Sequence, residues 1–235
     1  MGPHPHGWWI VFHLVLFVFW LGGDLGVFYA SRYVLNPALG PEARTTAVKI
    51  MSGLDLGPKI CLVLFLPSGF TLMALEPHGA ELFGVALFPW WSVLAVWAFA
   101  LGWLALTVRD HHAPGRHPLV RRADWTIRLG LIAAITGAAA YTLIAERPFG
   151  VTTDPRWLGG KLALYALTIA AGLGIRLKLR GFGPAFGALA ASGSTPEVEG
   201  KLRASVDGCL PYVWAIWAGV LAAAVLGVLK PGAAL

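Results

Sequence analysis

Apolar residues in this chain are grouped in six long blocks, and short stretches rich in glycine, proline and charged residues separate them. About twenty apolar residues in a helix cross the hydrocarbon core of a bilayer, so each block is long enough to be a membrane span. The separating stretches, such as EPHGAE and HHAPGRHP, contain residues that end helices. The pattern predicts an all-α integral membrane protein, a bundle of six transmembrane helices that forms one membrane domain over residues 1–235. We expect the spans at about 8–30, 55–75, 85–107, 126–146, 158–177 and 209–229.

The composition supports this prediction and excludes several other classes of protein. The chain is 57% hydrophobic and 13% charged, whereas soluble domains carry about 25% charged residues. The first block lacks the basic start and the small-residue cleavage site of a signal peptide, so we expect it to remain as the first span. Cys61 and Cys209 form no zinc-binding spacing. The net charge of +6 does not indicate a nucleic-acid partner, because basic residues of membrane proteins gather in cytoplasmic loops.

The distribution of Lys and Arg among the connections predicts the orientation. The first, third and fifth connections are rich in both residues, whereas the N-terminal segment and the second connection contain neither. The fourth connection and the C-terminal segment contain few. Because Lys and Arg are concentrated on the cytoplasmic side, both termini are expected on the outer, periplasmic side of a bacterial inner membrane.

His13 lies inside the first span, in the segment GWWIVFHLVLFVFWLGGDLG. An imidazole in the bilayer is costly without a partner, so it is a candidate functional group. We interpret it as a ligand of a metal or of haem iron, with a hydrogen bond between helices as the alternative. Lys161 lies near the start of the fifth span, which begins on the same side, and is expected at a similar depth. It either belongs to the same site or extends its ammonium group to the interface.

A second pair of charged residues is expected in the opposite leaflet. Asp24 lies near the cytoplasmic end of the first span, and Lys59 lies near the start of the second. Their matching depths predict an ion pair between neighbouring antiparallel helices, with a proton relay as the alternative. Asp55 precedes Lys59 at the expected start of the second helix, where a carboxylate suits the helix dipole.

Further metal-binding side chains are expected on the outer side. Met73, at the end of the second span, and His78, just beyond it, are candidate ligands for haem iron or Cu(I). His4 and His6 form an HPH pair in the N-terminal segment. Together with His13 and Met73 they would line an entry for copper, although the chain has only three Met and two Cys.

Four of the six spans resemble a known family. The segments HLVLFVFWLGGDLGVFY, KIMSGLDLGPKICLVLFLPSGFTLM, RWLGGKLALYAL and LPYVWAIWAGVLAAAVLGVLKP are similar, in this order, to helices of the HemJ-type protoporphyrinogen oxidases and the related CopD-like membrane proteins. The resemblance implies haem b as the cofactor, with His13 and Lys161 at the positions that the family needs. Spans three and four have no counterpart in the short HemJ pattern and would be an insertion.

Three functions follow as expectations. The first is a haem-b membrane redox protein, in which His13 binds the iron and electrons pass to quinone, to a redox partner or from a porphyrin substrate. The second is a CopD-like protein of copper transport or homeostasis. The third is a non-catalytic membrane subunit of a larger complex or an oligomer, because small residues in ITGAAAYTL and AGVLAAAVLG permit close helix packing.

Overall fold

The structure, a computed structural model, describes residues 5–75, 89–148 and 154–231. All regular secondary structure in these ranges is helical, which confirms the all-α class. His4 and His78 lie outside the described residues. The helices are α1 (Pro5–Val34), α2 (Pro41–Leu75), α4 (Trp90–His112), α5 (Pro118–Ile144), α6 (Arg156–Lys178), the short 3-10 helix η2 (Leu179–Gly181), α7 (Phe182–Ser192), α8 (Pro196–Asp207) and α9 (Leu210–Leu229).

Six helical stretches of the described chain are long and apolar enough to cross a membrane, which confirms the expected multi-pass protein. Each of them contains one of the predicted apolar blocks, apart from the ends of two blocks. Residues 145 and 146 follow the helix of the fourth block, and of residues 85–89 of the third, 85–88 lie outside the described residues. The six stretches are His6–Val34, Pro41–Leu75, Trp90–His112, Pro118–Ile144, Arg156–Ser192 and Pro196–Leu229.

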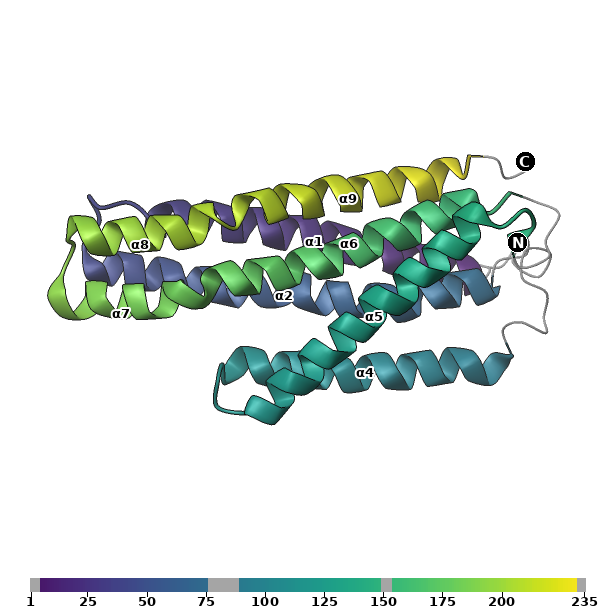
Figure 1. Ribbon diagram of the computed structural model, residues 1–235, viewed down its shortest axis with the longest axis horizontal. Helices are drawn as coiled ribbons and strands as arrows, with labels where there is room; N and C mark the ends of the chain where they lie inside the picture. The colour runs from purple at the N-terminus through teal and green to yellow at the C-terminus, as the bar shows by residue number, and fades with distance from the viewer. Residues whose placement is uncertain (1–4, 76–88, 149–153, 232–235) are drawn as a thin grey trace.

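The membrane-capable helices form an elongated bundle in which successive helices run in opposite directions (Figure 1). The first and last described residues lie at the same end, here called the terminal end, and α7 and α8 lie at the opposite, distal end. α1 packs on α2, α6 packs on both α5 and α9, and α4 connects α2 with α5. The largest apolar core lies between α1, α2, α5, α6 and α9, and its fully buried members include Trp20 and Ile169.

α2 is much longer than the sequence predicts, because it begins at Pro41 and continues through Pro58. The second span was expected to begin near residue 55, where the apolar block begins. A proline inside a helix removes a backbone hydrogen bond and needs space beside the preceding turn. In the structure Gly23 of α1 faces Pro58: a Cβ atom on Gly23 would lie 2.7 Å from the Cδ atom of Pro58. The absent side chain makes room for the proline inside a packed helix. Asp55 therefore lies within α2 and does not cap it.

The ends of α1 and α2 extend with α7 and α8 beyond the hairpin of α4 and α5 (Figure 1). Arg44 of α2 is 1% exposed and fastens this distal extension. Its Nε atom donates to the Val34 carbonyl at 2.7 Å, and Nη1 and Nη2 donate to the two carboxylate oxygens of Glu199 at 2.6 and 3.0 Å. Residues 181–200 lie between the fifth and sixth predicted spans. They contain α7 and the first five residues of α8, and these two helices pack together around Leu189 and Leu202.

Candidate functional site

His13 of α1 lies in the half of the bundle nearest the terminal end and is half-buried. Its Nδ1 atom is 2.8 Å from the hydroxyl oxygen of Ser68 on α2. The ring of Phe65, one turn earlier on α2, stands edge-on to the imidazole with the ring centres 4.5 Å apart. The imidazole is therefore fixed on one side by a hydroxyl group and on another by an aromatic ring.

The hydrogen bonds of Ser68 suit one tautomer of His13. The serine hydroxyl lies 2.7 Å from the carbonyl of Leu64, and when it donates its single proton there, its oxygen accepts the proton on Nδ1 of His13. In this tautomer the neutral imidazole carries its lone pair on Nε2. Metal-binding histidines show the same arrangement, because one ring nitrogen donates to a neighbouring group while the other binds the metal.

Lys161 of α6 lies in the same half of the bundle and is also half-buried. Its position depends on Gly227 of α9: a Cβ atom on that glycine would lie 2.6 Å from Nζ of the lysine. His13 is about 12 Å along α1 from its first residue, and Lys161 about 8 Å along α6. Both residues therefore lie in the same half of the bundle and at similar depths along their helices.

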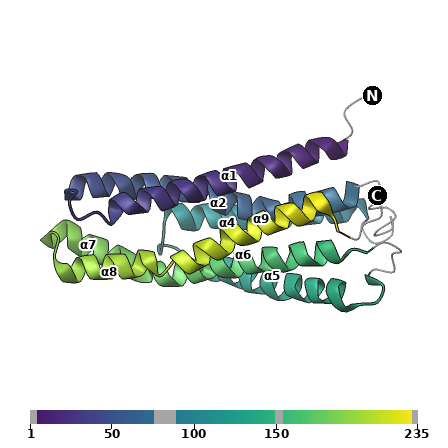
Figure 2. The same cartoon turned by 90° about the horizontal axis from the view of Figure 1, so that it is seen from above.

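The helices around these two residues separate toward the terminal end. α1 and α9, which contact each other through Phe28 and Trp214, diverge toward the terminal end in the view of Figure 1 but not in that of Figure 2. α4 also reaches this region, since Trp97 contacts the rings of Trp9 and Phe12 on α1 and donates to the Thr71 hydroxyl at 2.9 Å. The aromatic rings of Trp9, Phe12 and Trp97 thus lie within about one turn of His13.

The side chains of His13, Lys161 and their neighbours have the chemistry that a haem group needs. His13 offers a neutral nitrogen with a free lone pair, an apolar setting and a fixed orientation. Met73 is half-buried in the last turn of α2, and its role as a further ligand stays a prediction. For copper the described residues offer less, because no three His, Cys, Asp or Glu side chains among them gather in a metal-binding group.

Asp24 and Lys59 have other partners than those predicted. Lys59 pairs with Asp55, one turn earlier on α2, and its Nζ atom lies 3.3 Å from Nδ1 of His111 on α4. Asp24 accepts a hydrogen bond from the indole of Trp20, one turn earlier on α1, at 3.1 Å. The expected pair assumed that α2 begins near residue 55. Because α2 begins at Pro41, a carboxylate in its own helix is available to Lys59.

The sequence analysis missed the most buried charged group of the described chain, Asp124 of α5, which has no exposed surface. Its carboxylate accepts hydrogen bonds from the Trp103 indole at 2.8 Å and the Thr107 hydroxyl at 3.3 Å, both on α4. It also accepts from Nε of Arg128, one turn later, at 2.9 Å and from Arg176 of α6. The carboxylate therefore joins three helices. The spacing of Asp124 and Arg128, four residues apart at the edge of an apolar block, is the signal that could have identified it.

The surroundings of Asp124 indicate a structural cluster. Arg128 is 2% exposed, and its guanidinium group lies over the Trp103 ring, 5.3 Å from the ring centre. Arg176 also lies 3.7 Å from Asp110, so two carboxylates face two guanidinium groups. These four charges compensate one another and fasten the α4–α5 hairpin to α6.

Two of the polar centres described above differ in what they offer a ligand. One is the balanced ion cluster of α4, α5 and α6. The other contains His13, with its free Nε2 lone pair, and Lys161 in the half of the bundle nearest the terminal end. Only the second offers a free ligand atom for chemistry, which makes it the candidate functional site. In comparisons with known proteins, no family model, no curated protein and no solved structure matches the chain.

Proposed function

We propose that this chain is a haem-b membrane redox protein in which Nε2 of His13 binds the iron. The single observation that carries the proposal is the hydrogen bond between His13 and Ser68. It satisfies Nδ1 and leaves Nε2 as a ligand in an apolar part of a multi-pass membrane protein. A histidine that served only to connect helices would need the bond from Nδ1 to Ser68 and would not use Nε2, so the two roles differ in what Nε2 binds.

The residues around His13 have separable tasks in this proposal. Ser68 holds the tautomer, and Phe65 restricts rotation of the ring. Lys161 supplies a positive charge that suits a haem propionate, or it binds the iron when deprotonated. Bound haem would supply one-electron transfer. Quinone, a protein redox partner or a porphyrin is the proposed exchange partner.

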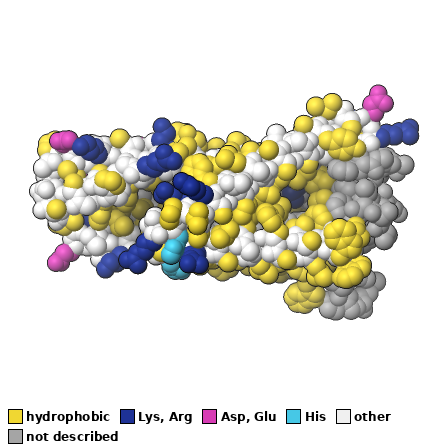
Figure 3. Space-filling view, turned by 60° about the horizontal axis from the view of Figure 1, so that its bottom comes forward, with side chains coloured by type: hydrophobic (Ala, Val, Ile, Leu, Met, Phe, Trp, Pro, Cys, Tyr) yellow, Lys and Arg dark blue, Asp and Glu magenta, His cyan; other side chains and the backbone are white. Residues whose placement is uncertain are grey.

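The location of the protein is part of the proposal. Six apolar helices support a multi-pass membrane protein. We place it in a bacterial inner membrane with the terminal end on the periplasmic side, on the basis of the Lys and Arg distribution. On the face that Figure 3 shows, hydrophobic side chains cover the half toward the terminal end, whereas Lys and Arg gather nearer the distal end. That distribution suits a cytoplasmic distal end.

Titration of the purified protein with haemin in neutral detergent tests the proposal. The expected result is a Soret band that saturates at one haem per chain. His13→Ala should abolish the band, and Ser68→Ala should weaken binding by about 10–100-fold because it removes the group that orients the ligand. The matched control is His112→Ala, since His112 is an exposed histidine at the distal end of α4.

The control variant should bind haemin like the unchanged protein. A Soret band that survives His13→Ala would contradict the proposal. So would the absence of any band in the unchanged protein, and that result would favour a non-catalytic membrane subunit.

A further inference from the structure

A buried indole N–H group without an acceptor lies at the terminal end of the bundle. Trp157, in the first turn of α6, is 7% exposed. Its Nε1 atom is enclosed and has no hydrogen-bond partner in the structure as described. Most buried polar groups in proteins are hydrogen-bonded, because a donor removed from water without an acceptor is unfavourable. The position therefore indicates an acceptor that the described residues do not supply.

Two lysines flank this indole. Lys161 follows Trp157 by four residues on the same face of α6. Lys230, which follows the last residue of α9, places its Nζ atom 5.4 Å from the centre of the Trp157 ring. An indole N–H and two ammonium groups can only donate hydrogen bonds. The three side chains together form a set of donors with a positive charge.

The backbone at Lys230 shows that a lysine at this position has a cost. Lys230 caps α9 with φ 38° and ψ 57°, and no other described non-glycine residue has a positive φ. Glycine is the usual residue in this left-handed conformation, because side chains disfavour it. A lysine here places a cation over Trp157 at the expense of backbone strain.

The start of α6 adds the positive end of a helix dipole to the same place. The residue that precedes the helix is Pro155, which has no capping side chain, and the amide of Arg156 donates to the Asp154 carboxylate at 3.0 Å. The first turn of a helix favours negative charge. It contains Trp157 itself, so it supports the same ligand chemistry as the side chains.

We propose that Trp157, Lys161 and Lys230 form a binding site for an oxyanion, a carboxylate or a phosphate, on a membrane amphiphile. The site lies where apolar helices end, which is where the headgroup of an amphiphile lies in a bilayer. The flexible tip of Lys230 covers the indole and has to move aside when the anion binds. A propionate of a tetrapyrrole and the phosphate of an anionic phospholipid share this chemistry. The tetrapyrrole source rests on the proposed function, whereas the phospholipid source does not.

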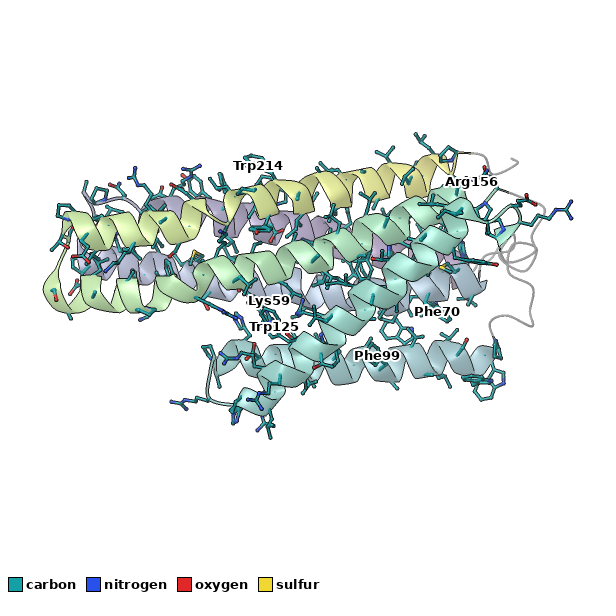
Figure 4. The ribbon with its side chains drawn as sticks, viewed as in Figure 1. Lys59, Phe70, Phe99, Trp125, Arg156 and Trp214 are labelled. Carbon is teal, nitrogen blue, oxygen red and sulfur yellow. The ribbon has the colours of Figure 1, made fainter. Side chains whose placement is uncertain are left out.

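Three variants test the site. Trp157→Phe keeps the aromatic ring and removes the N–H group. Lys230→Gly removes the ammonium group and suits the left-handed backbone, so a loss of binding cannot be attributed to a damaged helix end. The matched control is Arg156→Met: Arg156 lies next to Trp157 at the terminal end (Figure 4), is 54% exposed and is paired with Asp154 at 3.1 Å. The control removes a positive charge from the same turn without touching the donor set.

Each variant is titrated with haemin and with haemin dimethyl ester, which lacks the carboxylates. Its thermal unfolding is also measured in nanodiscs with and without phosphatidylglycerol. If the ligand is a tetrapyrrole, the unchanged protein binds haemin at least about tenfold more tightly than the ester, as expected for one charge-assisted hydrogen bond. Trp157→Phe and Lys230→Gly remove this preference, and Arg156→Met retains it. If the ligand is a phospholipid, the same two variants lose the stabilisation by phosphatidylglycerol.

The outcomes separate this proposal from the proposed function. Stabilisation by phosphatidylglycerol that depends on Trp157 and Lys230, without haem binding, supports the oxyanion site and contradicts the haem proposal. Haem binding through His13 with equal affinity for haemin and its ester, and without an effect of phosphatidylglycerol, overturns the oxyanion site alone. The site is also overturned when both variants behave like Arg156→Met with every probe.

Discussion

Replacement of Asp124 by asparagine is the sharpest test of how the helices are held together. The substitution keeps the shape of the side chain and removes its charge. The carboxylate is fully buried and faces Arg128 and Arg176, and it accepts from Trp103 and Thr107. An asparagine amide can still accept from the indole. It cannot compensate the two guanidinium groups.

The expected magnitude follows from the burial of each partner. Removal of one partner from a buried ion pair costs about 3–5 kcal/mol, because the other charge stays buried without compensation. Arg128 is 2% exposed, so its charge would stay buried without compensation. Arg176 is 21% exposed and would still have the Asp110 carboxylate at 3.7 Å. We therefore expect a loss of about 3 kcal/mol, near the lower limit of that range. This loss corresponds to about a hundredfold change in the unfolding equilibrium.

Unfolding of the purified protein in mixed micelles, followed by circular dichroism, measures this loss. The matched control is Glu197→Gln, because Glu197 and Lys201 form an ion pair of the same spacing whose side chains are 77% and 63% exposed. The control should unfold like the unchanged protein. Asp124→Asn together with Arg128→Met should recover part of the lost stability, since the uncompensated charge is then absent. If Asp124→Asn unfolds like the control, the cluster does not fasten these helices and the reasoning is refuted.

Two further predictions concern packing and pH. A Cβ atom on Gly174 would lie 2.3 Å from the ring of Tyr212, so Gly174→Ala should destabilise the protein by about 1–3 kcal/mol in thermal unfolding. Gly172→Ala meets nothing within 4 Å and should not destabilise it; equal effects of the two would contradict the close α6–α9 packing. The hydrogen bond from Arg44 lowers the pKa of Glu199 below its ordinary 4.5. The stabilisation by this carboxylate is complete above pH 4.5 and is lost as the pH falls through the lower folded pKa. Hydrogen exchange in α8 should rise over that acidic range and lose this dependence in Glu199→Gln, and an unchanged pH dependence would contradict the role of the pair.

The sequence predicted the six apolar helices well, because hydrophobic length alone determines which segments can cross a bilayer. It placed the start of α2 near residue 55, whereas α2 begins at Pro41 and continues through Pro58. The proline is accommodated by Gly23 on another helix, and a contact between helices is not visible in a linear pattern. The structure pairs Lys59 with Asp55, one turn earlier on the same helix, and the sequence analysis considered only partners on the neighbouring helix.

The candidate site was predicted in part. His13 was recognisable because an imidazole in an apolar span is unusual. Ser68 was not, because a serine in a helix commonly donates to a carbonyl of the preceding turn, as this one does to Leu64. That it also forms a hydrogen bond with His13 depends on how α1 and α2 pack. Asp124 lay just outside the expected fourth span, where a carboxylate is usually solvated, and only the packing of α4 and α6 buries it.

The central claim is that Nε2 of His13 binds haem iron, and chemical rescue tests it most directly. His13→Gly leaves a gap where the imidazole was, and free imidazole can occupy it. The absorption spectrum of the haemin-loaded protein should show a Soret band in the unchanged chain and none in His13→Gly. Added imidazole should restore the band to the variant. A band in His13→Gly without imidazole, or no band in the unchanged protein, would contradict the claim.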